Sequence, residues 1–322
     1  MKKGEDRLDF VTMGETMVAL VPDEPGRLRY ASGFRPRIAG AESNTAIGMR
    51  RLGHSAGWIS RIGTDEFGQM ILRALRADGV DTSLVEADPQ APTGLMFKET
   101  AAGGETRVTY YRAGSAASRM DAAFVPEEVF RDAGVLHLTG ITPVLSGSCR
   151  EAVLRAVELA EQYQVPVSFD PNLRFKLWKG RDYTGLMRTL AARAKILLIG
   201  KDEAEHLYGT GEIEPLREQV CSAGKTEYLV VKDGANGAVA ASRSECVPIP
   251  PFPCRSVDPV GAGDAFNAGF LAGLLEGKTL AECGQYGAVM GAMATQTTGD
   301  VEGYPDREEL LAALSRQKTV YR

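Results

Sequence analysis

The sequence predicts an α/β fold, a three-layer α/β/α sandwich in which helices cover both faces of a mostly parallel central sheet. Two observations support this prediction. Short apolar runs alternate with segments of helical periodicity along the whole chain, which is the rhythm of a layered sheet with crossover helices. The apolar runs are rich in Val, Ile and Leu or are otherwise mostly apolar, as expected for strands buried in a sheet.

The elements follow from this pattern in chain order. Strands are expected at Phe10–Val21, Val135–Thr139, Val165–Phe169, Lys195–Ile199, Tyr228–Val231 and Gly237–Ala240. Apolar residues at helical spacing predict helices at Ser148–Tyr163, Tyr183–Ala194, Asp202–Tyr208 and Arg307–Leu314. The run PIPPFP at Pro248–Pro253 predicts a stiff extended connection after a strand.

One segment departs from the α/β rhythm. Thr93–Arg112 contains two strand-like runs around Ala-Gly-Gly, which is typical of a β-hairpin. The chain shows no internal repeat and no linker that would divide it. We therefore expect one domain over residues 1–322, with a small β lid formed from about residues 14–38 and 93–113.

Composition and charge argue against several classes of partner. The 37 basic and 42 acidic residues give a net charge near -5, which offers no electrostatic footprint for nucleic acid or for an anionic membrane. No run of 18 apolar residues occurs, and the five cysteines form no CxxC pair. We expect a cytoplasmic protein with reduced thiols, without a nucleic-acid or membrane partner.

The strongest chemical signal is a glycine-rich loop, Asp258-Pro-Val-Gly-Ala-Gly-Asp264, that leads into an apolar helix. Gly261 and Gly263 allow close backbone approach to a ligand, and the helix start offers free N–H groups and a positive dipole end. Asp264 would suit a helix N-cap. With a phosphate beside it, it could instead deprotonate an attacking hydroxyl, while the amides of Gly261, Ala262 and Gly263 stabilise the transferred phosphoryl group.

Two other glycine motifs do not fit. A dinucleotide-binding fingerprint would need its third glycine at Phe266. A P-loop would need a glycine five positions before Gly224 or Gly277, where Gln219 and Ala272 stand.

The loop and the helix that follows it, DPVGAGDAFNAGF, resemble the second signature of the ribokinase-like (PfkB) sugar kinases. Ala39-Gly-Ala-Glu-Ser-Asn44 resembles their first signature, a glycine-rich sugar-binding turn, although Ala41 replaces the second glycine. The resemblance extends from Met13-Gly-Glu15 to Gly299–Pro305. It implies a ribokinase-like fold, ATP and Mg²⁺ as cofactors with a monovalent cation as a further option, and Asp264 as the base.

Within that family, three segments resemble the 2-keto-3-deoxygluconate kinases: YYRAGSAA at 110–117, TGITP at 139–143 and FDPNLR at 169–174 followed by Leu177-Trp178. The resemblance assigns sugar-acid binding to Tyr110, Arg112 and Arg174, with Gly40, Ala41, Asn44, Ile141 and Asp264. Two arginines suit a carboxylate, although a lone arginine after a strand is usually solvated or packs with its stem. Tyr110 and Tyr111 alternate across a strand, so only one can face the sugar.

Two further segments bear on how the nucleotide and its metal ion would be bound. VKDGANG at 231–237 resembles the family's nucleotide-side turn and implies that Lys232, Gly234 and Gly237 contact ATP, together with Gly261 and Gly263; a plain hairpin explains the same residues. Gly200-Lys-Asp-Glu203 keeps the glutamate of a metal-associated motif, so Glu203 could act on Mg²⁺ through water. A glutamate also suits a helix start.

The resemblance therefore implies phosphorylation of 2-keto-3-deoxygluconate at its terminal hydroxyl. A fructokinase or another ketose kinase is the nearest alternative, because DPNLR and LW also resemble fructokinases. A non-catalytic sugar-binding regulator is the second alternative, and the arginines disfavour a nucleoside kinase. Met96 stands where one pattern of these kinases has a tyrosine. An exposed lid edge could pair with another subunit, so a homo-oligomer through the lid is expected.

Overall fold

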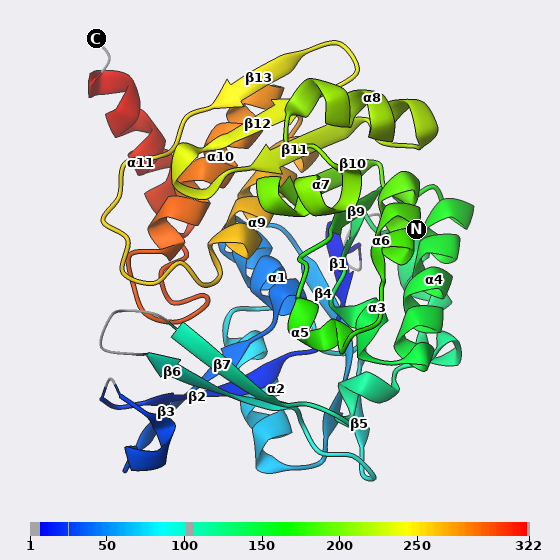
Figure 1. Ribbon diagram of the computed structural model, residues 1–322, viewed down its shortest axis with the longest axis vertical. Coiled ribbons are helices and arrows are strands. Elements are labelled where there is room, and N and C mark those ends of the chain that lie inside the picture. The colour runs from blue at the N-terminus through cyan, green and yellow to red at the C-terminus, as the bar shows by residue number, and fades with distance from the viewer. Residues whose placement is uncertain (1–6, 25, 101–105, 321–322) are drawn as a thin grey trace.

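The computed structural model describes residues 7–24, 26–100 and 106–320. Figure 1 shows a body of helices and strands with a small sheet at one end. The central sheet has the order β13-β12-β11-β10-β9-β8-β1-β4-β5. Its strands are β1 (Phe10–Met13), β4 (Ala56–Gly63), β5 (Val85–Asp88), β8 (Val135–Thr139), β9 (Val167–Asp170), β10 (Ile196–Gly200), β11 (Tyr228–Lys232), β12 (Ala238–Ala241) and β13 (Cys246–Ile249).

The pairing in this sheet is parallel from β5 to β11 and antiparallel only at β12 and β13. Successive residues of the central strands enter opposite apolar cores. In β10, Ile196 and Leu198 lie in one core while Leu197 and Ile199 lie in the other, as the two-residue period of a strand requires. The predicted α/β sandwich with a mostly parallel sheet is confirmed.

Helices cover both faces of the sheet (Figure 1). One core contains residues of α1 (Ala41–Arg51), α2 (Glu66–Ala77), α9 (Ala262–Leu275), α10 (Leu280–Ala294) and α11 (Arg307–Val320). The other contains residues of α3 (Thr142–Leu145), α4 (Gly147–Gln162), α5 (Phe175–Trp178), α6 (Thr184–Arg193), α7 (Lys201–Tyr208) and α8 (Ile213–Ala223). Helix α9 is buried from Asp264 to Gly273, so the glycine loop starts a core helix.

The lid is a separate sheet with the order β3-β2-β6-β7. Its strands are β2 (Met17–Pro22), β3 (Phe34–Ala39), β6 (Leu95–Thr100) and β7 (Thr106–Tyr111). Strands β6 and β7 pair antiparallel, which confirms the predicted hairpin, while its Ala-Gly-Gly turn lies outside the described residues.

Two predictions about strands were wrong. Phe10–Val21 is not one strand, because β1 ends at Met13 in the central sheet and β2 begins at Met17 in the lid. The polar residues between them are buried and bonded elsewhere: Thr16 donates to Ser43 and Glu15 accepts from Arg112. At the far edge, Pro248 and Ile249 belong to β13, whereas residues 250–253 form the expected connection outside any helix or strand. An edge strand tolerates proline because it has a side without pairing partners.

Among the described residues, no helix combines the length and the apolar character needed to cross a membrane.

Candidate active site

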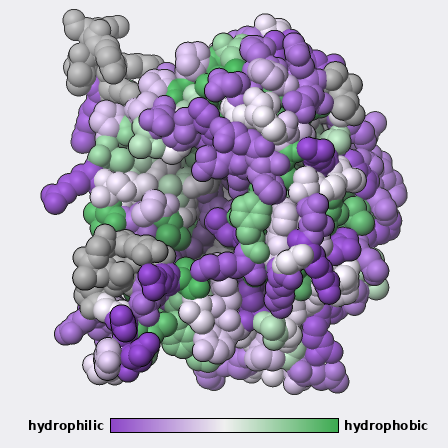
Figure 2. Space-filling view, in the orientation of Figure 1, coloured by the Kyte–Doolittle hydropathy of each residue, from purple (hydrophilic) through white to green (hydrophobic). Residues whose placement is uncertain are grey.

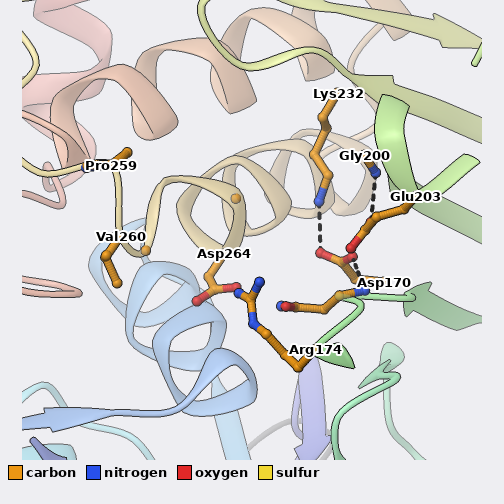
Figure 3. Close-up of a pocket in the computed structure, with 11 residues that line it drawn as sticks. Asp170, Arg174, Gly200, Glu203, Lys232, Pro259, Val260 and Asp264 are labelled. Atoms are coloured by element: carbon orange, nitrogen blue, oxygen red, sulfur yellow. Dashed lines mark hydrogen bonds and ion pairs between the residues drawn. The ribbon is translucent and has the colours of Figure 1, made fainter. Parts of the chain in front are cut away.

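Two cavities meet at the start of α9. The first, which we call the loop cavity, lies at the carboxyl ends of β9, β10 and β11, where open α/β sheets bind their ligands (Figure 3). Its lining residues are Asp170, Asn172, Arg174, Gly200, Glu203, Lys232, Pro259, Val260, Gly261, Gly263 and Asp264.

The second cavity, which we call the lid cavity, lies between the lid sheet and the body, and a hollow is visible there in Figure 2. Its volume of about 470 Å³ falls within the roughly 300–1,000 Å³ typical of small-molecule sites. Arg174, Val260, Gly261 and Asp264 line both cavities. Asp264 therefore stands at the junction between the two.

The backbone of the glycine loop is fixed by the segment between α10 and α11. Gly261 has a φ of 81°, and a Cβ at this position would collide with the backbone carbonyl of Asp300. Only glycine meets both demands without strain. The Tyr304 hydroxyl donates to the Gly261 carbonyl at 2.8 Å. These contacts set the direction in which α9 starts.

Asp264 does not cap this helix, since Gly261 occupies the N-cap position and Asp264 lies in the first turn. Its carboxylate accepts a hydrogen bond from Asn44 Nδ2 at 2.8 Å. Burial raises the pKa of Asp264 to about 7, and the charges of Asp170 and Asp300 act in the same direction. Asn44 and Arg174 oppose the rise. A carboxylate with a pKa near the working pH is well matched to general base catalysis.

The amides at the start of α9 were predicted to bind an anion. Ala262 N–H donates to the Pro259 carbonyl at 3.3 Å. The N–H groups of Gly261 and Gly263 have no hydrogen-bond partner among the residues described. Free N–H groups and the positive end of the helix dipole attract an anion there.

Lys232, predicted to contact a phosphate, lines the loop cavity but is also held by the protein (Figure 3). Its Nζ donates to Asp170 Oδ2 at 2.7 Å and to Asn267 Oδ1 at 3.1 Å. Burial alone would raise the pKa of Asp170, but the charge and hydrogen bond of Lys232, with the Asn267 amide, hold it below its usual range. Asp170 was missed as a site residue, although it is the carboxylate that directly ends strand β9.

Gly234 and Gly237 lie in the turn between β11 and β12, both with positive φ. Their conformations explain the glycines at these positions. Neither residue is among those that line the loop cavity.

Glu203 sits at the cavity wall with both carboxylate oxygens engaged. It accepts from the N–H of Gly200 at 2.9 Å and from the N–H of Leu173 at 2.6 Å. Burial raises the pKa of Glu203, as does the charge of Asp170. Asn172 Oδ1, in the same wall, is buried without a hydrogen-bond partner among the described residues. These hard oxygen atoms suit a Mg²⁺ ion that keeps several of its waters.

The residues that the sequence assigns to sugar binding come together in the lid cavity. Gly40, Ala41, Asn44, Tyr110, Arg112, Ile141 and Arg174 all line it. Tyr110 faces the cavity, whereas Tyr111 is 64% exposed and packs edge-on against Phe97 outside. The expected alternation of the two tyrosines is confirmed.

The two arginines of the lid cavity differ in their partners. Arg112 is buried, and its Nε donates to Glu15 Oε2 at 2.6 Å. Arg174 forms no ion pair within the described part of the chain, and its guanidinium points toward Asp264 (Figure 3). Lys176 also lines the cavity and has no ion pair among the described residues. The positive charges left uncompensated therefore lie on the body side, at the start of α5.

Two buried oxygen atoms in the same cavity are unsatisfied. Glu42 Oε1 accepts from Thr139 at 2.7 Å and from Thr142 at 2.8 Å, but its Oε2 has no partner among the described residues. Asn44 Oδ1 likewise has no hydrogen-bond partner among the described residues. Burial raises the pKa of Glu42. Buried polar atoms are normally hydrogen-bonded, so both oxygen atoms can accept hydrogen bonds from a ligand. Glu42 was not predicted as a site residue; its only signal was a charged residue in a small-residue turn.

A second ion pair crosses the lid cavity. Lys98 on β6 pairs with Asp300, and both side chains are buried, with exposures of 6% and 8%. Asp300 Oδ2 lies 3.4 Å from Asn44 Nδ2, the same nitrogen that donates to Asp264. Neither residue was predicted as a site residue. The signal for Lys98 was a charged residue on the inward side of a lid strand.

The chain is similar to known proteins over nearly its full length. A family described as pfkB family carbohydrate kinase matches residues 7–307. The chain is 38% identical to a 2-dehydro-3-deoxygluconokinase of Bacillus subtilis (strain 168), with 98% of each chain covered. It is 31% identical to Fructokinase-1 of Zea mays, with 95% of this chain and 97% of the relative covered.

The chain is also similar to a relative whose structure was solved with ligands bound. That structure is named as a ribokinase II from E. coli in complex with ATP and Mg²⁺, and it superposes with a TM-score of 0.89. The identity is 26%, and the superposition covers 96% of this chain and 99% of the relative.

Proposed function

The chain belongs to the pfkB family of carbohydrate kinases, and from this premise we propose that it transfers the γ-phosphoryl group of ATP to the terminal hydroxyl of 2-keto-3-deoxygluconate. The product would be 2-keto-3-deoxy-6-phosphogluconate. One observation carries the proposal: Asp264 lies at the junction of two cavities, with an anion site on one side and a polar, lid-covered cavity on the other. A base there would touch the hydroxyl as it attacks the phosphorus atom.

In the proposed reaction, Asp264 removes the proton of the sugar hydroxyl. The hydroxyl oxygen attacks the γ-phosphorus, and the bond from phosphorus to the β,γ-bridging oxygen breaks to release ADP. The amides of Gly261 and Gly263, with that of Ala262 beside them, would stabilise the charge on the transferred group. Lys232 Nζ lies 3.9 Å from where a Cβ on Gly263 would be, so its charge would act at the same place.

The loop cavity supports the nucleotide and metal side of the proposal. Glu203, through water, together with Asn172, would hold Mg²⁺. When bound, the ion would neutralise charge on the ATP phosphates. The related structure solved with ATP and Mg²⁺ supports this pair of cofactors. Gly234 and Gly237 remain proposed nucleotide contacts through the backbone of their turn.

The charge pattern of the lid cavity supports a sugar acid. Arg112 is already paired with Glu15, and Lys98 with Asp300. Arg174 and Lys176 are not paired among the described residues, so they are available to a carboxylate, which the planar guanidinium binds with two parallel hydrogen bonds. Tyr110, Asn44 and Glu42 would serve the hydroxyl and keto oxygens, alongside Gly40, Ala41 and Ile141.

The specific observation that favours a ketose kinase instead is the Arg112–Glu15 pair. Glu15 compensates the charge of one of the two arginines that favoured a sugar acid, although Arg112 still lines the cavity. Fructokinase-1 of Zea mays also resembles the chain over nearly its whole length. Fructose is therefore the main competing substrate. For a non-catalytic regulator, neither the raised pKa of Asp264 nor the open amides of the loop would be needed.

The lid supports a further proposal, a homo-oligomer formed through its edges. Strands β3 and β7 are the edge strands of the lid sheet, and Phe34 and Tyr111 are exposed on it. Sedimentation of the purified protein would test this.

A coupled assay of ADP release tests the main proposal. The purified protein would be offered 2-keto-3-deoxygluconate, fructose, ribose and 5-keto-2-deoxygluconate, with Asp264→Asn as the control. Selective turnover of the first sugar, lost in the variant, supports both substrate and base. Preference for fructose keeps the kinase and removes the sugar acid. No turnover of any sugar contradicts the proposed enzyme.

A further inference from the structure

Three positively charged residues of the lid segments form ion pairs with carboxylates outside the lid strands, and the pairs differ in burial. Arg37 on β3 pairs with Glu302, where 27% and 34% of the side chains remain exposed. Lys98 pairs with Asp300 in nearly complete burial. Arg112, just after β7, pairs with Glu15 at the crossing from body to lid. Of these pairs, that of Lys98 and Asp300 ends beside Asp264.

The contacts around Asn44 link Lys98 to Asp264. Asn44 Nδ2 lies 2.8 Å from Asp264 Oδ2 and 3.4 Å from Asp300 Oδ2, so two carboxylates share one amide. The other oxygen of Asp300 accepts from Lys98 Nζ. The carbonyl of Asp300 also packs against Gly261, the residue that starts α9. Asp300 therefore touches both the amide that holds Asp264 and the loop that carries it.

We propose that Lys98 is a positioning residue that couples the lid to Asp264: by compensating the charge of Asp300, it leaves the Asn44 amide to Asp264 while the lid covers the cavity. This inference rests on the proposed role of Asp264 as the base. When the lid moves away, Asp300 loses its cation and competes for the amide. Asp264 is then poorly oriented, and it activates a water molecule less readily in the open site. Asp264 is therefore correctly oriented as the base only when the lid covers the sugar.

Charged and polar groups face Asp264 from every element packed around it. They are Asn44 of α1, Asp170 of β9, Arg174 before α5, Lys232 of β11, and Asp300 and Tyr304 of the segment between α10 and α11. Asp170 is paired with Lys232 inside the body. The negative charge of Asp300 is compensated by Lys98 of the lid. Removing Lys98 exposes Asp264 to an additional negative charge, which raises its pKa.

A carboxyl titration in the protein without ligands tests this directly. The protein would be labelled with ¹³C in its aspartate carboxyl groups, and the Asp264 resonance assigned by its loss in Asp264→Asn. In Lys98→Met, the titration midpoint of Asp264 should move up by roughly one pH unit. In Asp300→Asn it should move down, because a negative neighbour is lost while Lys98 stays. Lys98→Met/Asp300→Asn should return close to the wild-type midpoint.

Arg37→Met is the matched control, since it removes the other lid-to-body ion pair near the C-terminal segment. It should leave the midpoint in place, as should Lys98→Arg, which keeps the charge. An unchanged midpoint in Lys98→Met, or an equal shift in Arg37→Met, overturns the proposal. If Lys98→Met does not fold, as judged by circular dichroism, the titration of Asp300→Asn takes its place as the test. The absence of a downward shift in that variant then overturns the proposal.

The titration uses neither sugar nor nucleotide, so its result stands apart from the identity of the substrate. A kinetic measurement then adds the link to catalysis. With whichever sugar is turned over fastest, kcat of Lys98→Met at pH 7 should fall about fivefold, and raising the pH by one unit should restore it to the wild-type value at pH 7. A rise in KM without change in kcat or in the pH profile would reduce Lys98 to a structural role and overturn the proposal.

Discussion

The loop cavity and the lid cavity share Asp264 but hold their charged groups by different means. In the loop cavity, the partners all belong to the body: Glu203 accepts from the backbone N–H groups of Gly200 and Leu173, and Asp170 pairs with Lys232. In the lid cavity, cations of the lid segments pair with carboxylates outside the lid strands, as in Arg112–Glu15 and Lys98–Asp300. The first arrangement is independent of the lid, whereas the second depends on it.

This difference has a functional consequence. An anion site made of backbone and helix dipole is preorganised and costs no rearrangement at the moment of reaction. A cavity whose charges are paired across a movable lid can be assembled only with the lid in place. Three substitutions and a change of pH would test this contrast, and their expected effects decrease in that order.

Asp264→Asn acts at the junction itself and should have the largest effect. Loss of the base should lower kcat by about 10²–10⁴-fold, measured by ADP release at saturating sugar. The same change should raise the melting temperature at pH 8. A carboxyl whose folded pKa of about 7 lies above its unfolded value destabilises the native state increasingly as the pH rises from 3.8 to about 7. Lower stability in the variant at pH 8 would contradict the burial argument.

Gly261→Ala tests the fixed loop. The added methyl meets the carbonyl of Asp300 in a residue with positive φ, so activity should fall about 10²-fold because reacting groups are displaced. Gly277→Ala is the matched control, since Gly277 also has a positive φ but no atom within 4 Å of its Cβ position. It should lose about 1 kcal/mol of stability and keep its kcat. Equal kcat in both variants would show that the loop geometry is not limiting.

Arg174→Gln tests the uncompensated charge of the lid cavity. If the substrate is a sugar acid, kcat/KM for it should fall by about 10–100-fold, while that for fructose should change little. Lys176→Gln should give a smaller loss of the same kind, because an ammonium on a flexible stem lacks the planar fork. Competition between the two sugars in one assay gives the ratio. Equal losses for both sugars would mean that Arg174 acts on the phosphate side.

Lowering the pH should have the mildest effect. Because Asp264 must be ionised to act as the base, log kcat/KM should decline with a slope of one below a midpoint near its pKa of about 7. Activity should therefore be lost as the pH falls, and it should level off above pH 8. A pH-rate profile in 0.15 M salt measures this. A flat profile between pH 6 and 8 would assign the proton to another group.

The glycine loop was predictable from the sequence, whereas the ion pairs of the lid cavity were not. Gly261, Gly263 and Asp264 are neighbours in one motif, so their geometry follows from local backbone rules. Lys98 and Asp300 lie 202 residues apart, and Arg112 and Glu15 lie 97 residues apart. No local pattern indicates that such residues will compensate each other. Arg112 was therefore predicted as a substrate-binding residue without its pairing to Glu15, which the fold supplies.

The break inside the expected strand Phe10–Val21 has the same origin. A continuous apolar run predicts one strand, but the fold uses its two halves in two sheets and buries Glu15 between them. The buried polar residues between the halves were the available signal.

The order of strands in the central sheet bears on how the chain acquires its structure. From β8 to β13, neighbours in the sheet are also neighbours in the sequence, so this half can form through short-range contacts. Strand β1 instead pairs with β4 and with β8, which lies more than a hundred residues later, after both segments of the lid. Because loop closure slows non-local pairing, we expect the C-terminal half to organise first during refolding. The half that carries the lid would then complete the molecule last.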